Sequence, residues 1–318
     1  MRIVRVAYRN LWAGGNDFSA EHIVECFPCL RGQYRFEISS DPQLVLYSVY
    51  GYYHSKVNES AIRVLYSGEA GDTYALGGKL PSELVPGAMR YRWGDFEYAY
   101  DPDFFDFGIT ASATTKPTNH YYMPAGFLHL NMYHNGVATL TEMRAPNTRE
   151  YFGNFIYSNP CQYRVEFLKE FSKYRRVECC GQVEHNNNEI QECGAYHREG
   201  YLGKQRFQNR CKFSIVFENC HYPGYNTEKI TDALLARSVP IYSGDPHISD
   251  VFNPAAIINV DRFANWEAAI EFIKMVDQND ELYQSFLDAP AFVGNVVPER
   301  FKEETFLRFW REILQRIT

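Results

Sequence analysis

Two kinds of apolar pattern alternate along this chain, and together they predict an α/β protein. One kind is a short continuous run bounded by Gly, Pro, Asn or Asp, as expected for a strand covered on both faces of a sheet. The other has apolar residues at every third or fourth position, as in an amphipathic helix. Strands are predicted at 2–8, 34–38, 44–49, 63–66, 96–100, 152–158, 177–180, 213–217, 239–243 and 257–260. Helices are predicted at 18–30, 163–174, 227–237, 266–276 and 298–317.

The order of these elements indicates two domains. The strand, helix and strand between residues 213 and 243 form the clearest unit, because so short a crossover fits only a compact parallel pair. Residues 111–149 are rich in Thr, Asn, His and Tyr without a sustained period, which predicts loops and a linker. A chain of 318 residues could form one large domain or two medium ones. The renewed pattern after residue 150 favours two α/β units divided there.

Composition narrows the class of protein. There are 32 Lys and Arg against 39 Asp and Glu, a net charge of −7, which argues against nucleic acid as a partner. The longest apolar stretch, 44–53, is interrupted by Ser48 and Gly51 and is shorter than the ~18 residues of a membrane-spanning helix. The first residues lack the apolar core of a secretion signal. We therefore expect a soluble, cytoplasmic protein without a transmembrane segment.

The eight cysteines are expected to be reduced thiols, because the chain is long and shows no secretion signal. Cys26 and Cys29 have the spacing of a metal or redox pair. A zinc site needs a second pair of ligands at similar spacing, and the sequence offers none. Packing of these two thiols in a core is the favoured interpretation.

The loop after the strand at 213–217 is the first candidate for chemistry. In a parallel sheet, ligands bind at the carboxyl ends of the strands, where the next helix begins. Asn226 or Thr227 can cap that helix, and Lys229 falls in its first turn, where a cation opposes the helix dipole and indicates a nearby anion. Backbone N–H groups and Lys229 would suit a diphosphate. The alternative is that Glu228 and Lys229 form a solvated helix start, and composition alone does not decide between them.

Residues 213–246, FSIVFENCHYPGYNTEKITDALLARSVPIYSGDP, resemble the donor-binding signature of the α-1,3-fucosyltransferases, glycosyltransferase family 10. That signature is close to F-E-N-[ST]-x(4,5)-Y-x-T-E-K, followed by a helix and V-P-[IV]. Cys220 replaces its usual Ser or Thr. Ser158-Asn159-Pro160 with Arg164 resembles a second family segment, and RVLYSGE at 63–69 resembles an amino-terminal strand ending in [ST]-G-E, with Ala70 in place of the usual Asn.

The resemblance implies the GT-B fold, in which two Rossmann-like domains face each other across a cleft. It implies an acceptor-side domain over 1–150, a GDP-fucose-binding domain over 151–300 and a closing helix over 301–318 that packs back across the domains. The implied reaction moves L-fucose from GDP-fucose, with inversion, to a hydroxyl of an oligosaccharide acceptor, most often O3 of N-acetylglucosamine. Glu69 is the candidate base for that hydroxyl. Without the resemblance, Glu69 would be interpreted as an exposed loop residue.

The resemblance also assigns the donor side. Arg164, with its bidentate fork, and Lys229, as a point charge, would stabilise the leaving diphosphate in place of a metal. If so, Lys229→Ala should lower turnover far more than stability. Further donor contacts are expected as follows: Glu228 to ribose or fucose hydroxyls, Asn219 and Tyr225 to the nucleotide or sugar, and Glu218 either to the donor or in orienting the loop.

No cofactor is expected to be required, and stimulation by a divalent metal is left open. No Asp-x-Asp pair follows an apolar strand, and Asp101-Pro102-Asp103 is interpreted as a turn. Tyrosines and phenylalanines crowd the first half, where some could stack on an acceptor sugar and most would pack in the core.

Three alternatives stay open: another nucleotide sugar, an α-1,4 linkage, or a binding module without turnover. The presence of Glu69 favours an enzyme over a binding module. The three arginines near the C-terminus, among apolar residues, predict at most a weak contact with a membrane surface.

Overall fold

The computed structural model describes residues 2–11, 18–48, 60–69, 105–111, 119–142, 146–190 and 198–317. Contacts divide the chain into two compact units. Unit 1 contains Met1–Val137, Tyr222–Tyr225 and Val297–Thr318, and unit 2 contains Ala138–His221 and Asn226–Val296. The strand predicted at 96–100, the turn at 101–103 and Ala70 lie outside the described residues. The acceptor-side and donor-side roles of 1–150 and 151–300 stay predictions.

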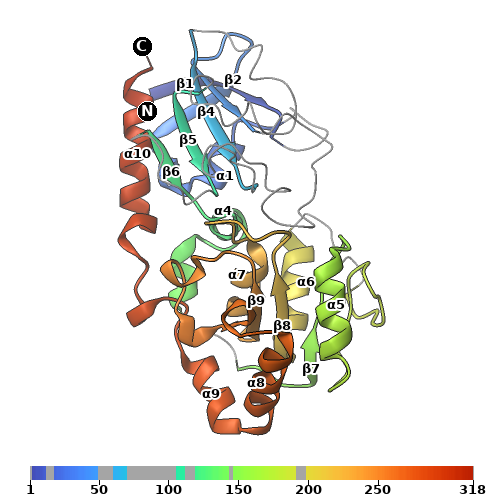
Figure 1. Cartoon of the computed structure of the whole chain (residues 1–318). Helices are drawn as coiled ribbons and strands as arrows, with labels where there is room; N and C mark the ends of the chain where they lie inside the picture. Colours follow the sequence, from blue (N-terminus) through green and yellow to red (C-terminus); the bar gives the residue numbers. More distant parts are fainter. Residues whose placement is uncertain are drawn as a thin grey trace. The chain divides into compact units, whose positions relative to one another are not determined.

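Unit 1 is built on a sheet of parallel strands in the order β2-β1-β3-β4-β5-β6 (Figure 1). The strands are β1 (Arg2–Arg9), β2 (Tyr34–Ile38), β3 (Leu44–Tyr47), β4 (Ile62–Ser67), β5 (Phe107–Thr110) and β6 (His120–Tyr122). The strands predicted at 2–8, 34–38, 44–49 and 63–66 are confirmed. The central residues of these four strands are buried. Every residue of β3 and of β5 is buried, as expected for a sheet covered on both faces.

The helix predicted at 18–30 is wrong in extent. It is replaced by the short helix α1 (His22–Cys26) and the 3-10 helix η1 (Pro28–Leu30). Pro28 cannot donate a backbone hydrogen bond to continue α1, so it begins the 3-10 turn instead. Cys26 and Cys29 are buried and free, and burial raises the pKa of both thiols to about 12. They are packing thiols, as the sequence predicts.

The prediction of loops throughout 111–149 is also wrong. This stretch includes β6, helix α4 (Ala125–Tyr133) and the 3-10 helix η5 (Val137–Thr141). Helix α4 buries Phe127, Leu128 and Leu130, which lie on different sides of the helix. A helix that is apolar on several sides lacks the polar face from which a helical period is recognised.

The last helix begins later than predicted. Pro298 precedes the 3-10 helix η10 (Glu299–Phe301), and α10 (Glu303–Gln315) follows. Within unit 1, the ring of Trp310 lies 5.0 Å from that of Phe27, and the Arg2 guanidinium donates to the carbonyl of Leu314 at 3.2 Å. The packing of this helix across both units stays a prediction. Among the described residues, no helix has the length and apolar character needed to cross a membrane.

Unit 2 contains a smaller parallel sheet in the order β10-β9-β8-β7. Its strands are β7 (Tyr151–Asn154), β8 (Cys211–Phe217), β9 (Val239–Ser243) and β10 (Ile258–Asn259). The predicted strand at 177–180 is reduced to one bridge between Glu178 and Asn154. The helices are α5 (Gln162–Phe171), α6 (Arg198–Gln208), α7 (Glu228–Leu235), α8 (Trp266–Gln278) and α9 (Asp280–Asp288), of which α6 and α9 are not predicted.

The core of unit 2 explains this arrangement. Phe213, Ile215 and Phe217 alternate along β8 and join one apolar cluster with residues of α5, α8 and α9. The strand, helix and strand predicted at 213–243 are confirmed as β8, α7 and β9. Because both strands run parallel, the loop after β8 and the first turn of α7 lie at the carboxyl edge of the sheet.

Candidate active site

One carboxylate, that of Glu218, links the two ends of the loop between β8 and α7. Glu218, the residue after β8, is fully buried and accepts hydrogen bonds from the backbone N–H of Thr227 at 2.7 Å and from its hydroxyl at 2.9 Å. Thr227 is the N-cap of α7, and its hydroxyl oxygen accepts from the backbone N–H of Lys229. Of the two predicted capping residues, the structure selects Thr227. Glu218 therefore fixes where α7 begins.

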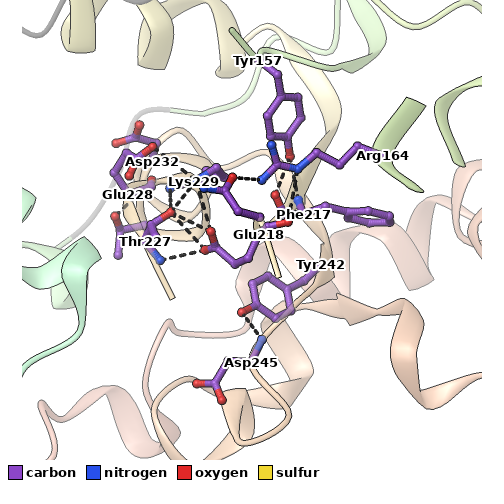
Figure 2. Close-up of polar contacts among 12 residues, drawn as sticks. Tyr157, Arg164, Phe217, Glu218, Thr227, Glu228, Lys229, Asp232, Tyr242 and Asp245 are labelled. Carbon is purple, nitrogen blue, oxygen red and sulfur yellow. Dashed lines mark hydrogen bonds and ion pairs between the residues drawn. The ribbon is translucent and has the colours of Figure 1, made fainter. Parts of the chain in front are cut away.

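Lys229 lies between acidic groups at this helix start (Figure 2). Its ammonium is 3.1 Å from a Glu218 oxygen, 3.7 Å from a Glu228 oxygen, and donates to the Thr227 hydroxyl at 2.8 Å. Burial opposes its charge, but the carboxylates of Glu218 and Glu228 outweigh burial and raise the pKa of Lys229. Lys229 is therefore a fixed cation at the carboxyl edge of the sheet.

Arg164 provides a second cation at the same edge. It lies in the first turn of α5 and is only 1% exposed. Its guanidinium donates to the side-chain oxygen of Asn219 at 2.5 Å and to the carbonyl of Glu218 at 3.2 Å. The guanidinium also lies 4.3 Å from the ring centre of Tyr157, a cation–π arrangement that holds its plane (Figure 2). These contacts hold the guanidinium in one orientation, so Arg164 is a preorganised cation.

The structure brings most of the predicted donor residues together in unit 2. Arg164 contacts Asn219 and Glu218, and Lys229 contacts Glu218 and Glu228. The burial and contacts of Glu218 support its alternative role, orienting the loop. Direct binding of the donor by any of these residues stays a prediction.

Two predicted residues belong to unit 1. Tyr225 lies in the segment Tyr222–Tyr225 and is buried. Glu69 follows the end of β4 and is half-buried, and its backbone N–H donates to the hydroxyl of Ser67 at 3.2 Å. The roles of Tyr225 in donor binding and of Glu69 as a base stay predictions.

Two residues that the sequence does not single out, Asp232 and Tyr157, hold elements of the site in place. Asp232, one turn after Glu228 on α7, is buried and accepts from Lys204 at 2.8 Å and from Gln205 at 2.9 Å, both on α6. This buried ion pair ties α7 to α6. Tyr157, under the Arg164 guanidinium, donates its hydroxyl to the carbonyl of Ile215 in β8. The spacing of apolar residues in α6 is the sequence signal that could indicate the contact between α6 and Asp232. No local sequence pattern indicates the contact between Tyr157 and β8.

Close packing against Glu218 requires a glycine at position 244. It follows β9 with φ +153°, a conformation that L side chains rarely adopt. A Cβ at this position would lie 2.7 Å from the Cβ and Cγ of Glu218. The backbone of Gly244 therefore lies directly against the side chain that holds Lys229.

In the part of the chain that the structure describes, no three His, Cys, Asp or Glu side chains are grouped to hold a metal ion. The expectation that no cofactor is required stays a prediction.

Known proteins similar to this chain are fucosyltransferases. Residues 150–303 match the family model "Glycosyltransferase family 10 (fucosyltransferase) C-term". An alpha-(1,3)-fucosyltransferase of Helicobacter pylori is 39% identical over 139 residues, which cover 43% of this chain and 27% of that protein. The 4-galactosyl-N-acetylglucosaminide 3-alpha-L-fucosyltransferase 9 of Rattus norvegicus is 31% identical over 66% of this chain and 55% of its own length. The GDP-fucose protein O-fucosyltransferase 3 of Xenopus laevis is 30% identical over 48% of this chain and 32% of its own length.

Solved structures share the fold. A crystal structure of an alpha1,3-fucosyltransferase with GDP-fucose has a TM-score of 0.68 over 100% of this chain and 92% of that chain, at 21% identity. An alpha-glucosyltransferase in complex with UDP and DNA has a TM-score of 0.50 at 12% identity.

The fold class is GT-B, with two Rossmann-like units, as the sequence predicts. Residues 150–303, which include the 213–246 motif, match the model of glycosyltransferase family 10, so the predicted resemblance of that motif is confirmed. The alignments span between about a quarter and about half of the length of the curated relatives named above.

Proposed function

We propose that this protein is an inverting fucosyltransferase that moves L-fucose from GDP-fucose to a hydroxyl of an oligosaccharide. The observation that carries the proposal is a pair of fixed cations, the buried Arg164 and the half-buried Lys229, at the carboxyl edge of the sheet in the region that matches family 10. A sugar diphosphate needs fixed positive charge at this edge, because negative charge develops on the leaving diphosphate as the sugar bond breaks.

In the proposed reaction, the acceptor oxygen forms a bond to the anomeric carbon of fucose while the bond from that carbon to the GDP oxygen breaks. The acceptor proton passes to a base, for which we propose Glu69, and GDP leaves with the bonding electrons. Attack from the face opposite the diphosphate inverts the anomeric centre. Glu69 is suited to this role by its carboxylate and by its place after a parallel strand, where ligands of such sheets bind.

On the donor side, Arg164 would bind diphosphate oxygens through its planar fork, and Lys229 would add a point charge. Glu228, the first residue of α7, would accept hydrogen bonds from hydroxyls of the ribose or fucose. Glu218 would act through Lys229 and Thr227 and would not touch the donor. Because the two side-chain cations supply the charge that a metal would otherwise supply, we propose that turnover requires no metal.

As the acceptor group we propose O3 of N-acetylglucosamine, because one relative is named an alpha-(1,3)-fucosyltransferase and another a 4-galactosyl-N-acetylglucosaminide 3-alpha-L-fucosyltransferase. Another relative is named as a protein O-fucosyltransferase. The acceptor screen should therefore contain N-acetyllactosamine and peptides with Ser or Thr.

The test is transfer from GDP-fucose to these acceptors, with the linkage and anomeric configuration of the product read by NMR. The proposal predicts an α-linked fucose, because GDP-L-fucose carries the β configuration at its anomeric carbon. A β-linked product would contradict inversion. Transfer from another nucleotide sugar, with none from GDP-fucose, would contradict the assigned donor.

A further inference from the structure

Three polar side chains outside the predicted site meet at the carboxyl ends of β8, β9 and β10. His221 lies in the loop after β8, Ser243 is the last residue of β9, and Asp261 follows β10 in the 3-10 helix η8 (Val260–Arg262). Nε2 of His221 is 2.9 Å from the Ser243 hydroxyl and 3.2 Å from an Asp261 oxygen. The Ser243 hydroxyl donates to that same oxygen at 2.8 Å.

This arrangement differs from a nucleophilic Ser-His-Asp triad. In a triad, the serine and the aspartate face different ring nitrogens, so that one nitrogen can take the serine proton while the other is held by the carboxylate. Here the same nitrogen faces both partners, and the serine donates directly to the carboxylate. The cluster therefore joins three strand ends and does not activate the serine.

Two routes lead from Asp261 toward the cations of the site, one through direct contacts and one partly along the chain. Its second oxygen accepts from the backbone N–H of Gly244 at 3.0 Å, and Gly244 lies against the side chain of Glu218, which holds Lys229. On the other route, Asp261 contacts His221, which is two residues after Asn219, the partner of Arg164.

The contact between His221 and Asp261 depends on charge. The hydrogen bond to Asp261 raises the pKa of His221. Burial opposes the charge on Asp261, yet hydrogen bonds led by that from His221 keep the pKa of Asp261 below its usual value. Among the described residues, two phenols also lie near the pair: Tyr163 on α5, 5.8 Å from the His221 ring, and Tyr242 on β9, and both are neutral because burial raises their pKa.

We propose that His221 is a positioning residue that, when protonated, clamps the donor-binding loop to Asp261 and Ser243 and so holds the diphosphate cations in place. The inference rests on the proposed function, because it requires that the donor bind at Arg164 and Lys229. The charge of the clamp is fully present below the ordinary histidine pKa of about 6.5 and is lost as the pH rises through the higher pKa of the folded protein, which leaves only a neutral hydrogen bond. Affinity for the donor should fall over the same range.

The test is calorimetric titration with GDP-fucose between about pH 6 and about pH 9, a range that spans histidine ionisation. GDP-fucose is the probe because its diphosphate, esterified at both ends, loses no proton over this range. The wild-type dissociation constant should rise about two- to fivefold toward high pH, the effect typical of a partly exposed ion pair. His221→Gln should bind weakly at every pH, and His221→Arg should keep the tighter affinity throughout.

His247→Gln is the matched control. His247 lies in the same unit, pairs with Asp250 at 3.7 Å and is 59% exposed, so its variant should follow the wild-type curve. If His221→Gln does not fold, Asp261→Asn gives the same test, because it removes the charge that holds the proton on His221. A wild-type slope that persists in either variant would overturn the inference and leave the donor assignment intact. Folded wild-type protein that fails to bind GDP-fucose at any pH would instead overturn the proposed function.

Discussion

Removal of Lys229 should destabilise the protein as well as impair donor binding, contrary to what the sequence alone predicts. The Glu218 side chain is 0% exposed and that of Lys229 only 15%, so in Lys229→Met the Glu218 carboxylate keeps its buried place without its cation. Loss of one partner of a buried ion pair typically costs about 3–5 kcal/mol. Thr227 still donates two hydrogen bonds to Glu218, so we expect the lower part of that range, about 3 kcal/mol.

A double-mutant cycle separates the ion pair from the rest of the site. Glu218→Gln with Lys229→Met removes both charges, and the double variant should be less destabilised than the sum of the single variants by about 2 kcal/mol. Urea unfolding followed by circular dichroism provides the four free energies of unfolding, provided that the m-values agree. Only the variants that retain Lys229 should keep measurable affinity for GDP-fucose. A coupling energy near zero would refute the argument that these two residues form a buried pair.

Three further predictions concern other parts of the account. Arg164→Lys should lower kcat/KM about a hundredfold, because an ammonium replaces neither the paired hydrogen bonds to Asn219 and Glu218 nor the stack on Tyr157. A comparable loss in Arg175→Lys, an exposed arginine of the same unit, would contradict this reason. Glu69→Gln should abolish transfer while leaving the affinity for GDP-fucose unchanged by calorimetry. Turnover should persist after treatment with EDTA, and an inactive protein restored by Mg²⁺ or Mn²⁺ would show that the two cations do not suffice.

The parts of the fold that the sequence predicts are those with a strong local pattern. Strands β8 and β9, with α7 between them, follow from apolar runs on either side of an amphipathic helix with a threonine cap. Helix α4 is missed because its buried residues face several directions, and α1 is overextended because the apolar period continues past Pro28. Each miss reflects tertiary burial or backbone chemistry that the period does not contain.

The residues of the candidate site, like the elements of the fold, can be predicted from the sequence only where a local pattern marks them. Residues of the 218–229 motif are adjacent in sequence, so a family pattern can identify them together. Their supports come from distant segments: Lys204 reaches Asp232 from α6, and Asp261 reaches His221 across 40 residues of sequence. The burial of Glu218 depends on the backbone of Gly244 packed against it, which the pattern F-E-N does not indicate. Only the three-dimensional structure separates residues suited to meet the donor from those that hold them.

The most direct measurement of the central claim is calorimetric titration of the wild-type chain with GDP, GDP-fucose and UDP, repeated with Arg164→Lys and Lys229→Ala. The account predicts micromolar binding of the two guanosine nucleotides, weaker or absent binding of UDP, and loss of binding in both variants while circular dichroism still shows a folded protein. Wild-type protein that is folded and binds neither GDP nor GDP-fucose would contradict the claim that the carboxyl edge of this sheet is a donor site.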